Sequence, residues 1–381
     1  MGGSFKLLTV WGIDIKVHVT FPLILIWAAI QFGYLAGNGM AGGVFGVIVV
    51  TLLFVIVTLH ELGHSYAALR YGVPVEQIVL LPLGGVAQLK NIPENPWQEF
   101  VIAIAGPAVN FAIAVVLYLF AVVLNIQISS LDTLLNNFTS VTFNAVFSYL
   151  FVYNLFLGLF NLIPAFPMDG GRILRAFLAA RLDYVRATAV SATIGRAIAL
   201  LFGLYGFLGG GFSLILIAFF VYIGAGQERE AVTTRSVLRG LTVGQAFSRQ
   251  TKTLRPDDVV QTAVNLTLSS HQANYPVCDG DQLVGLLTYP QLLQALHEGG
   301  AETAVSTAML TDLPILSPAT DLIDAQQLLR ENQLAALPVM ENGRFLGLLT
   351  TSDISEIYSL VSAAPDLLPR KQNEPLHPAK Y

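Results

Sequence analysis

The chain has 381 residues, of which 54% are hydrophobic and only 12% are charged. Charged residues make up about 25% of a typical soluble domain, so this composition excludes a purely soluble globule and indicates a polytopic membrane protein. A net charge of -5 gives no sign of nucleic-acid binding, and a single cysteine, Cys278, excludes both an intramolecular disulfide and a thiolate metal cage.

Six apolar runs are long enough to cross a bilayer, alone or with their flanks. They lie at 19–36, 43–70, 100–124, 143–163, 187–207 and 211–226. We expect no cleavable signal peptide, because the segment before the first run lacks an apolar core. The predicted fold class is therefore an α-helical polytopic membrane domain of about six transmembrane helices.

The basic residues predict the orientation of these spans. The connections 37–42, 125–142 and 208–210 contain no Lys or Arg, whereas the connections on the other side carry Arg70, Lys90, Arg172, Arg175, Arg181 and Arg186. The positive-inside rule therefore places the second group in the cytoplasm. With an even number of spans, we expect a multi-pass protein of the plasma membrane with both termini cytoplasmic.

A polar pentad, His60-Glu61-Leu62-Gly63-His64, lies near the end of the second run. Residues four apart share one face of a helix, so both imidazoles can bind one tetrahedral ion, and Glu61 is close enough to hold a metal-bound water. This HExxH pattern is typical of zinc hydrolases. The alternative is a structural pair of buried histidines, but ionisable groups within a membrane are costly and usually functional.

The segment after the second run contains two short apolar stretches around Gly84 and Gly85 and predicts a β-hairpin within 73–90. A hairpin beside a buried site either offers an edge to an extended peptide or only caps the helix bundle. In the third run, Gly106 and Asn110 are expected to serve helix packing, with the Asn amide bonding across helices.

The fourth run ends in a Pro-rich segment, Asn161 to Arg172, that includes Pro164, Pro167 and Asp169. Broken helix at membrane depth is tolerated only where protein or a wet cavity surrounds it, so a site is expected here. Asp169 lies next to a membrane-depth segment on the same side as Glu61, which makes it the natural third metal ligand. The alternative role for Asp169 is to cap the following helix.

Together these motifs resemble the site-2 protease family of intramembrane zinc metalloproteases. The matching residues are His60, Glu61, Leu62, Gly63, His64, Asn161, Pro164, Pro167, Asp169, Gly170 and Gly171. The resemblance covers about residues 10–226. It implies that His60, His64 and Asp169 bind one zinc ion, that Glu61 is the general base, and that Asn161 steadies the substrate or the oxyanion. It also implies single-span membrane proteins as substrates. His18 lies in a segment that looks typical of the branch with a cytoplasmic nucleotide-sensing appendage. We expect it to have a structural role at the interface, and the alternative is that it comes near the site or replaces a ligand.

The polar part of the chain repeats after a charged linker. Ala273, Pro276, Val277, Gly285, Leu286, Leu287 and Thr288 recur 62 residues later as Ala335, Pro338, Val339, Gly347, Leu348, Leu349 and Thr350. Two such copies of helix, strand and strand can bury one shared core, so we expect a soluble α/β pair.

This repeat resembles a tandem CBS domain pair, a module that in many proteins binds adenosine nucleotides. The resemblance implies that Thr350 and Asp353 contact ATP, ADP or AMP in the second copy. The first copy keeps Thr288 but has Gln291 where Asp is expected. A homodimer formed through the CBS pair is also implied, and a dimerisation module without a ligand is the alternative.

The expected organisation is a transmembrane metalloprotease domain at 1–226, a linker at 227–240, a CBS pair at 241–362 and a disordered tail at 363–381. The two CBS copies are expected at about 241–298 and 303–362. The predicted function is a zinc-dependent intramembrane endopeptidase, cutting near the cytoplasmic side and regulated by adenosine nucleotides. The alternatives are a CBS-gated metal transporter or channel and an inactive scaffold. A transporter would need polar residues along a path through several spans, whereas here they gather on one side.

Overall fold

The computed structural model describes residues 3–82, 84–89, 93–130, 134, 142–270, 272–364 and 367–369. The chain divides into two compact units, Met1–Val232 and Thr233–Tyr381. Lys90 and nearly all of the predicted tail lie outside the described residues. The division falls within the predicted linker 227–240, most of which is the last part of a long helix, α8 (Phe212–Leu238), because charged helix formers simply extend the apolar run.

Five helices in the described part of the first unit are long and apolar enough to cross a membrane. They are α2 (Gly39–Arg70), α3 (Pro96–Leu124), α5 (Phe143–Asn161), α7 (Tyr184–Tyr205, continuing as a π-helical turn to Gly210) and α8. The first predicted span is shorter: α1 (Pro22–Ala29) and a π-helical turn (Ile30–Leu35) extend about 21 Å at 1.5 Å per residue. The five long apolar helices and this shorter one agree with the prediction of about six.

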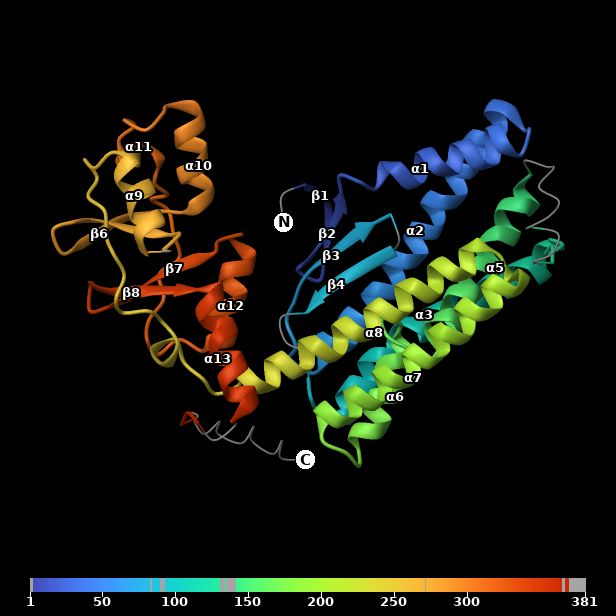
Figure 1. The fold of residues 1–381 in the computed structure, drawn as a ribbon. Coiled ribbons are helices and arrows are strands. Elements are labelled where there is room, and N and C mark those ends of the chain that lie inside the picture. The colour runs from blue at the N-terminus through green and yellow to red at the C-terminus, as the bar shows by residue number, and fades with distance from the viewer. Residues whose placement is uncertain are drawn as a thin grey trace. The chain divides into compact units, whose positions relative to one another are not determined.

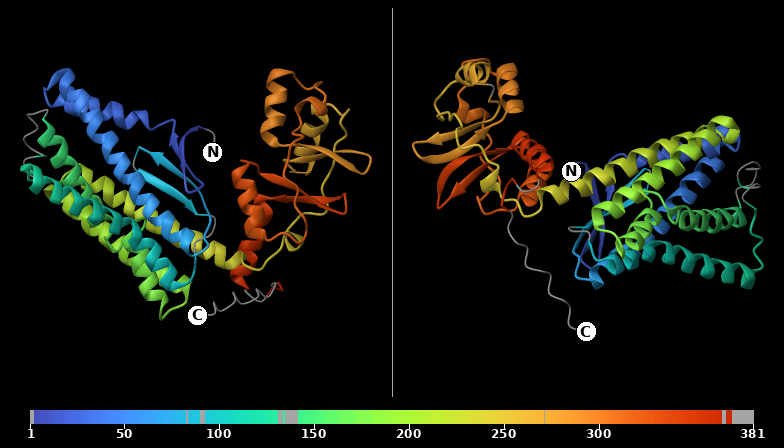
Figure 2. Two further views of the ribbon diagram at one scale, coloured as in Figure 1. Left: turned by 180° about the vertical axis from the view of Figure 1, so that it is seen from behind. Right: turned by 60° about the horizontal axis from the view of Figure 1, so that its bottom comes forward.

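A four-stranded sheet lies beside α2, as Figures 1 and 2 show. Its strands, in spatial order, are β1 (Ser4–Val10), β2 (Ile13–His18), β3 (Val75–Leu81) and β4 (Gly84–Leu89). The antiparallel pair β3–β4 confirms the predicted hairpin. We did not predict β1 and β2. Ile13 and Ile15 do alternate with polar residues and are almost fully buried, so the period-two signal is present.

The pairing of β2 with β3 is parallel and joins segments that are far apart in the sequence. Ile15 lies opposite Ile78, with α1 and α2 forming the connection between the two strands. Ile13, Ile15 and Ile78 pack against Leu62 of α2 and Ile102 of α3. This small core places the sheet against the turn of α2 that contains the HExxH motif.

The short helix α6 (Asp169–Ala179) begins at Asp169, directly after the Pro-rich break. Met168 is the residue before its first turn, and Asp169 does not serve as its N-cap. Ala165, Phe166 and Met168 of the break are buried against α7 and α8. The break is therefore enclosed by protein, as membrane-depth irregular backbone requires.

The second unit contains two similar hairpins that confirm the repeat. The first copy has α9 (Val260–Ser270), β5 (Tyr275–Asp279), β6 (Gln282–Leu287), α10 (Tyr289–Glu298) and the short α11 (Val305–Ala308). The second has α12 (Leu322–Glu331), β7 (Ala336–Glu341), β8 (Arg344–Thr350) and α13 (Thr351–Ala363). Isolated bridges also recur 62 residues apart, as Leu254 with Val277 and Leu316 with Val339.

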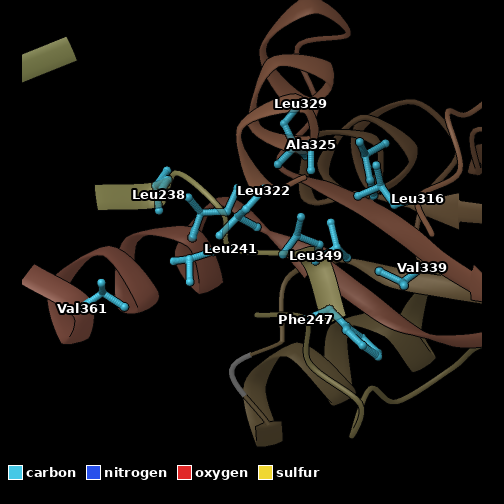
Figure 3. Close-up of a cluster of buried hydrophobic side chains, with 13 residues drawn as sticks. Leu238, Leu241, Phe247, Leu316, Leu322, Ala325, Leu329, Val339, Leu349 and Val361 are labelled. Atoms are coloured by element: carbon cyan, nitrogen blue, oxygen red, sulfur yellow. The ribbon is translucent and has the colours of Figure 1, made fainter. Parts of the chain in front are cut away.

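Each copy has its own apolar core. Figure 3 shows the core of the second copy, where Leu316, Leu329 and Leu349 are almost fully buried. Leu286 of one hairpin and Leu348 of the other pack together and join the two copies. Cys278 is half-buried on β5, and burial together with the charge of Asp281 raises the pKa of its thiol, which fits a structural residue.

Candidate active site

His60 and His64 lie one turn apart on the inner face of α2 and are 4% and 5% exposed. Their Nε2 atoms are 3.1 Å apart. Asp169, at the start of α6, brings its Oδ2 within 3.2 Å of His60 Nε2 and 3.1 Å of His64 Nε2. The structure thus brings together the three residues that the sequence predicted as metal ligands, from two helices separated by more than 100 positions in the chain.

The other nitrogen of each histidine is held by a group on α3. His60 Nδ1 donates to Asn110 Oδ1 at 2.5 Å, and His64 Nδ1 donates to the Ile102 carbonyl at 2.7 Å. The Asn110 amide nitrogen donates to Asn154 of α5, which leaves its oxygen as the acceptor toward His60. Because Nδ1 carries the proton in both neutral rings, both Nε2 atoms present lone pairs.

Two imidazole lone pairs and a carboxylate oxygen therefore converge on one point. Without a cation these three acceptors repel one another, and with one they form a ligand set. Ligands about 2.0–2.2 Å from a tetrahedral zinc ion lie roughly 3.3 Å from each other, close to the observed separations. Among the described residues, His60, His64 and Asp169 are the group of this kind that could hold a metal ion, and the donor set suits zinc.

Glycines allow α3 and β4 to approach this cluster. A Cβ at Gly106 would lie only 2.7 Å from His60 Nε2, so any larger residue would push α3 away from the histidines. A Cβ at Gly85 would lie 2.8 Å from Glu61 Cγ. The expected close packing at Gly106 is confirmed, although its neighbours are the predicted ligands themselves and not an apolar helix face.

Glu61 lies next to His60 on α2 and is half-buried. Its Oε2 accepts a hydrogen bond of 3.1 Å from the Ala87 amide of β4. In the described sheet β4 is an edge strand, and the Ala87 N–H points away from β3 toward the helix. The predicted hairpin thus lies directly beside the acidic residue of the HExxH motif.

Asn161 ends α5 just before the Pro-rich break, and its side chain makes no hydrogen bond with the described residues. Asn110 and Asn154, in contrast, are fully buried and bonded to each other and to His60. The sequence predicted a packing role for Asn110, with its amide bonding across helices, but not the bond to His60. A polar residue one turn from Gly106, on the same face of an apolar helix, was the available signal. His18 bonds to Thr20 at 2.8 Å, which fits a structural role.

Comparison with known proteins decides the family. Residues 48–202 match Peptidase family M50, and a zinc metalloprotease of Methanocaldococcus jannaschii is 34% identical over 96% of this chain and 99% of its own length. The chain belongs to the site-2 protease family. Rip3 of Mycobacterium tuberculosis is 32% identical to the protease over 80% of this chain and 79% of Rip3.

The family assignment extends to the second unit. Residues 243–298 and 305–359 of the protease each match the CBS domain. The solved site-2 protease of Methanocaldococcus jannaschii is 42% identical, covers 59% of this chain and 95% of its own, and superposes with a TM-score of 0.43. The M50 and CBS matches, together with the zinc metalloprotease relatives, confirm the predicted family, architecture and peptidase class.

The predicted nucleotide residues contact each other in the second CBS copy. Thr350 N and Oγ1 both donate to Asp353 Oδ2 at 2.7 Å, and Ser248 Oγ donates to Asp353 Oδ1 at 3.0 Å. This is a capping box at the start of α13. In the first copy Thr288 is 3% exposed and lies at the same position before α10, but its side chain forms no cap.

Proposed function

We propose that this protease is a zinc-dependent intramembrane endopeptidase that cuts the transmembrane segments of single-span membrane proteins near the cytoplasmic side. The cluster of His60, His64 and Asp169, with Glu61 beside it, carries the proposal. The motif lies on α2, a 32-residue helix that is long and apolar enough to cross a membrane, which supports a site at membrane depth. His60 is ten residues before Arg70, the basic residue that ends α2 and that we place at the cytoplasmic interface.

In this proposal His60, His64 and Asp169 hold the zinc ion. Bound there, zinc supplies Lewis-acid chemistry and lowers the pKa of a coordinated water. Glu61 takes a proton from the attacking water while the oxygen of that water bonds to the scissile carbonyl carbon. Glu61 then delivers that proton to the amine nitrogen as the C–N bond breaks. Asn161 is proposed to donate to the carbonyl oxygen as it becomes negatively charged.

The substrate has to unwind before it reacts, because a helical peptide bond is shielded by its own hydrogen bonds and neighbouring turns. The edge of β4 is the proposed place for the unwound segment, since an extended peptide can add to a sheet edge through main-chain hydrogen bonds. The contact between Glu61 and Ala87 supports this choice, because it shows that the edge runs past the proposed general base.

Cleavage of tagged single-span membrane proteins by the purified protein in detergent tests the proposal. Wild type is compared with Glu61→Gln, and bound zinc is assayed in both. We expect one zinc per chain in each protein and a loss of about 10²- to 10⁴-fold in cleavage for the variant, because it keeps the ligands but lacks the base.

The proposal would be contradicted if wild type and variant both bound zinc and neither cut any of the tagged membrane proteins. Zinc flux into vesicles containing the protein would then be measured, because it distinguishes the two remaining candidates, a CBS-gated transporter or channel and an inactive scaffold.

We also propose that adenosine nucleotides regulate cleavage through the CBS pair. Asp353 supports this, because a half-buried carboxylate next to the N-terminus of α13 can accept ribose hydroxyls while the helix end accepts phosphate. The nucleotide would have to displace the bonds that Asp353 now accepts from Thr350 and Ser248. Thr288 marks the second, less complete site.

Calorimetric titration of the full chain with AMP, ADP and ATP tests nucleotide binding. We expect Asp353→Ala to weaken binding by about 10-fold or more, since charge-assisted hydrogen bonds contribute about 1.5–3 kcal/mol each. Asp324→Ala, which removes an acid from the first turn of α12 and leaves Asp353 unchanged, is the control. Saturating nucleotide that leaves cleavage unchanged would refute regulation.

The proposed setting is the plasma membrane, with both termini cytoplasmic and a homodimer formed through the CBS pair. The basic residues Arg172, Arg175, Arg181 and Arg186, which lie in or beside α6 and at the start of α7, support this orientation. Protease protection of a tag at either terminus in sealed vesicles tests the orientation.

A further inference from the structure

Arg175 of α6 is completely buried, although it carries a charge. Its Nε donates to Glu99 Oε1 of α3 at 2.7 Å, and its Nη1 donates to Glu228 Oε1 of α8 at 2.5 Å. A buried guanidinium without such partners would be strongly destabilising. The three residues form a charge cluster that joins α3, α6 and α8.

The same guanidinium lies over two aromatic rings. Its carbon lies 4.9 Å from the ring centre of Phe166 and 4.8 Å from that of Tyr184. Phe166 is three residues before Asp169, in the segment that leads into α6. Cation–π contacts of this kind restrain both the arginine and the ring. Arg175 therefore holds the backbone on both sides of the proposed ligand Asp169.

Helix α8 packs along the whole of that segment. Val221 packs with Ala165 and Met168, and Ala225 packs with Phe166. A Cβ at Gly224 would lie 2.7 Å from Pro167 Cδ, so the backbone of α8 touches the segment closely. The position of Asp169 depends on α8 as well as on its own helix.

The far end of α8 belongs to the CBS unit. Leu238, its last residue, is fully buried in the core of the second CBS copy, where Figure 3 shows it.

We propose that the cluster of Glu99, Arg175 and Glu228 positions Asp169, and that Glu228 makes zinc affinity depend on α8. Glu99 alone neutralises Arg175, and Glu228 is 28% exposed, so charge balance does not require the second acid. What Glu228 adds is a connection between α8 and α6. This inference rests on the proposed zinc site and goes beyond it, because it names residues outside the ligand set that determine how tightly zinc is bound.

Competition for zinc between the full-length protein and a fluorescent chelator tests the inference. Glu228→Gln removes the ion pair and keeps the shape of the side chain. Its control is Glu230→Gln, an exposed acid on the same helix. We expect Glu228→Gln to bind zinc roughly 2- to 30-fold more weakly and Glu230→Gln to match wild type. Excess zinc should restore cleavage by Glu228→Gln, which a catalytic or folding defect would not allow.

A Glu228→Gln protein with the zinc affinity of the Glu230→Gln control would overturn the inference. Arg175→Lys is a second variant, which keeps the charge but loses the planar fork, and it should also bind zinc more weakly. If Arg175→Lys fails to fold, the zinc affinities of Glu228→Gln and Glu230→Gln still test the inference. Wild type that binds zinc but cuts no substrate would reject the proposed endopeptidase and leave the zinc comparison unaffected.

Discussion

Asn110 orients the His60 ring by accepting a hydrogen bond from its Nδ1, and Asn154 in turn orients the Asn110 side chain. The Asn154 side chain accepts from the Asn110 amide at 2.8 Å and donates to the Asn110 carbonyl at 2.9 Å. Both asparagines are fully buried between α3 and α5. Partners of this kind set the tautomer and direction of a metal-binding histidine, and they affect metal affinity although they do not touch the metal.

Asn110→Leu removes the acceptor and leaves the Nδ1–H of His60 buried without a partner. We expect zinc affinity, measured by chelator competition, to fall about 10- to 100-fold. Asn154→Leu should have a smaller effect, because Asn110 can still accept from His60. Wild-type zinc affinity in Asn110→Leu would show that the hydrogen bond to His60 has no part in metal binding.

Strand β4 has features that fit both of the roles that the hairpin pattern left as alternatives. It covers Glu61 and Val57 of α2 at Gly85, and it also has an edge that no described strand occupies. The Ala87 N–H is on that edge, where it bonds Glu61. Since adjacent peptide groups of a strand point in opposite directions, proline at position 87 would leave the ladder with β3 intact.

Ala87→Pro should therefore keep the sheet and the zinc content while removing the edge donor. We expect cleavage to fall by roughly 10-fold, the equivalent of about 1.4 kcal/mol, which is within the range for one hydrogen bond to a charged group. Val86→Ala, which changes only an exposed side chain of the same strand, is the control. Unchanged cleavage by Ala87→Pro would show that the hydrogen bond from Ala87 to Glu61 has no part in catalysis.

The two units differ in what stabilises the fold of each. Both units have apolar cores, and the first unit has in addition two histidines and an aspartate that converge without protons between them. A bound cation stabilises the folded state in proportion to its affinity, by about 2.7 kcal/mol at a concentration 100 times Kd. We therefore expect bound metal to raise the stability of the first unit only.

Removing zinc with a chelator should lower the thermal transition of the first unit and leave that of the CBS unit unchanged. All three tryptophans, Trp11, Trp27 and Trp97, lie in the first unit, so tryptophan fluorescence reports on it alone. Calorimetry follows both units. His60→Ala is the control, since it should show no dependence on zinc. A tryptophan transition in wild type that is independent of zinc would contradict this expectation.

The local sequence determined the elements and the chemistry of this protein. Apolar runs marked the long helices to within a few residues, because the hydrocarbon core demands length and hydrophobicity that no soluble helix needs. The exception is the end of α8, which continues through the charged segment to Leu238. The spacing of His60 and His64 marked a ligand pair, because one helical turn fixes their distance. The 62-residue repeat marked the CBS pair, because each copy buries an equivalent core.

The tertiary structure decided everything that depends on contacts between distant segments. The parallel pairing of β2 with β3 spans two helices, and no local pattern specifies it. Asn110, Asn154, Arg175 and Glu228 look like packing or surface residues in the sequence, because their partners are more than 40 positions away. A buried polar group acquires its role only from the group that the fold brings to it.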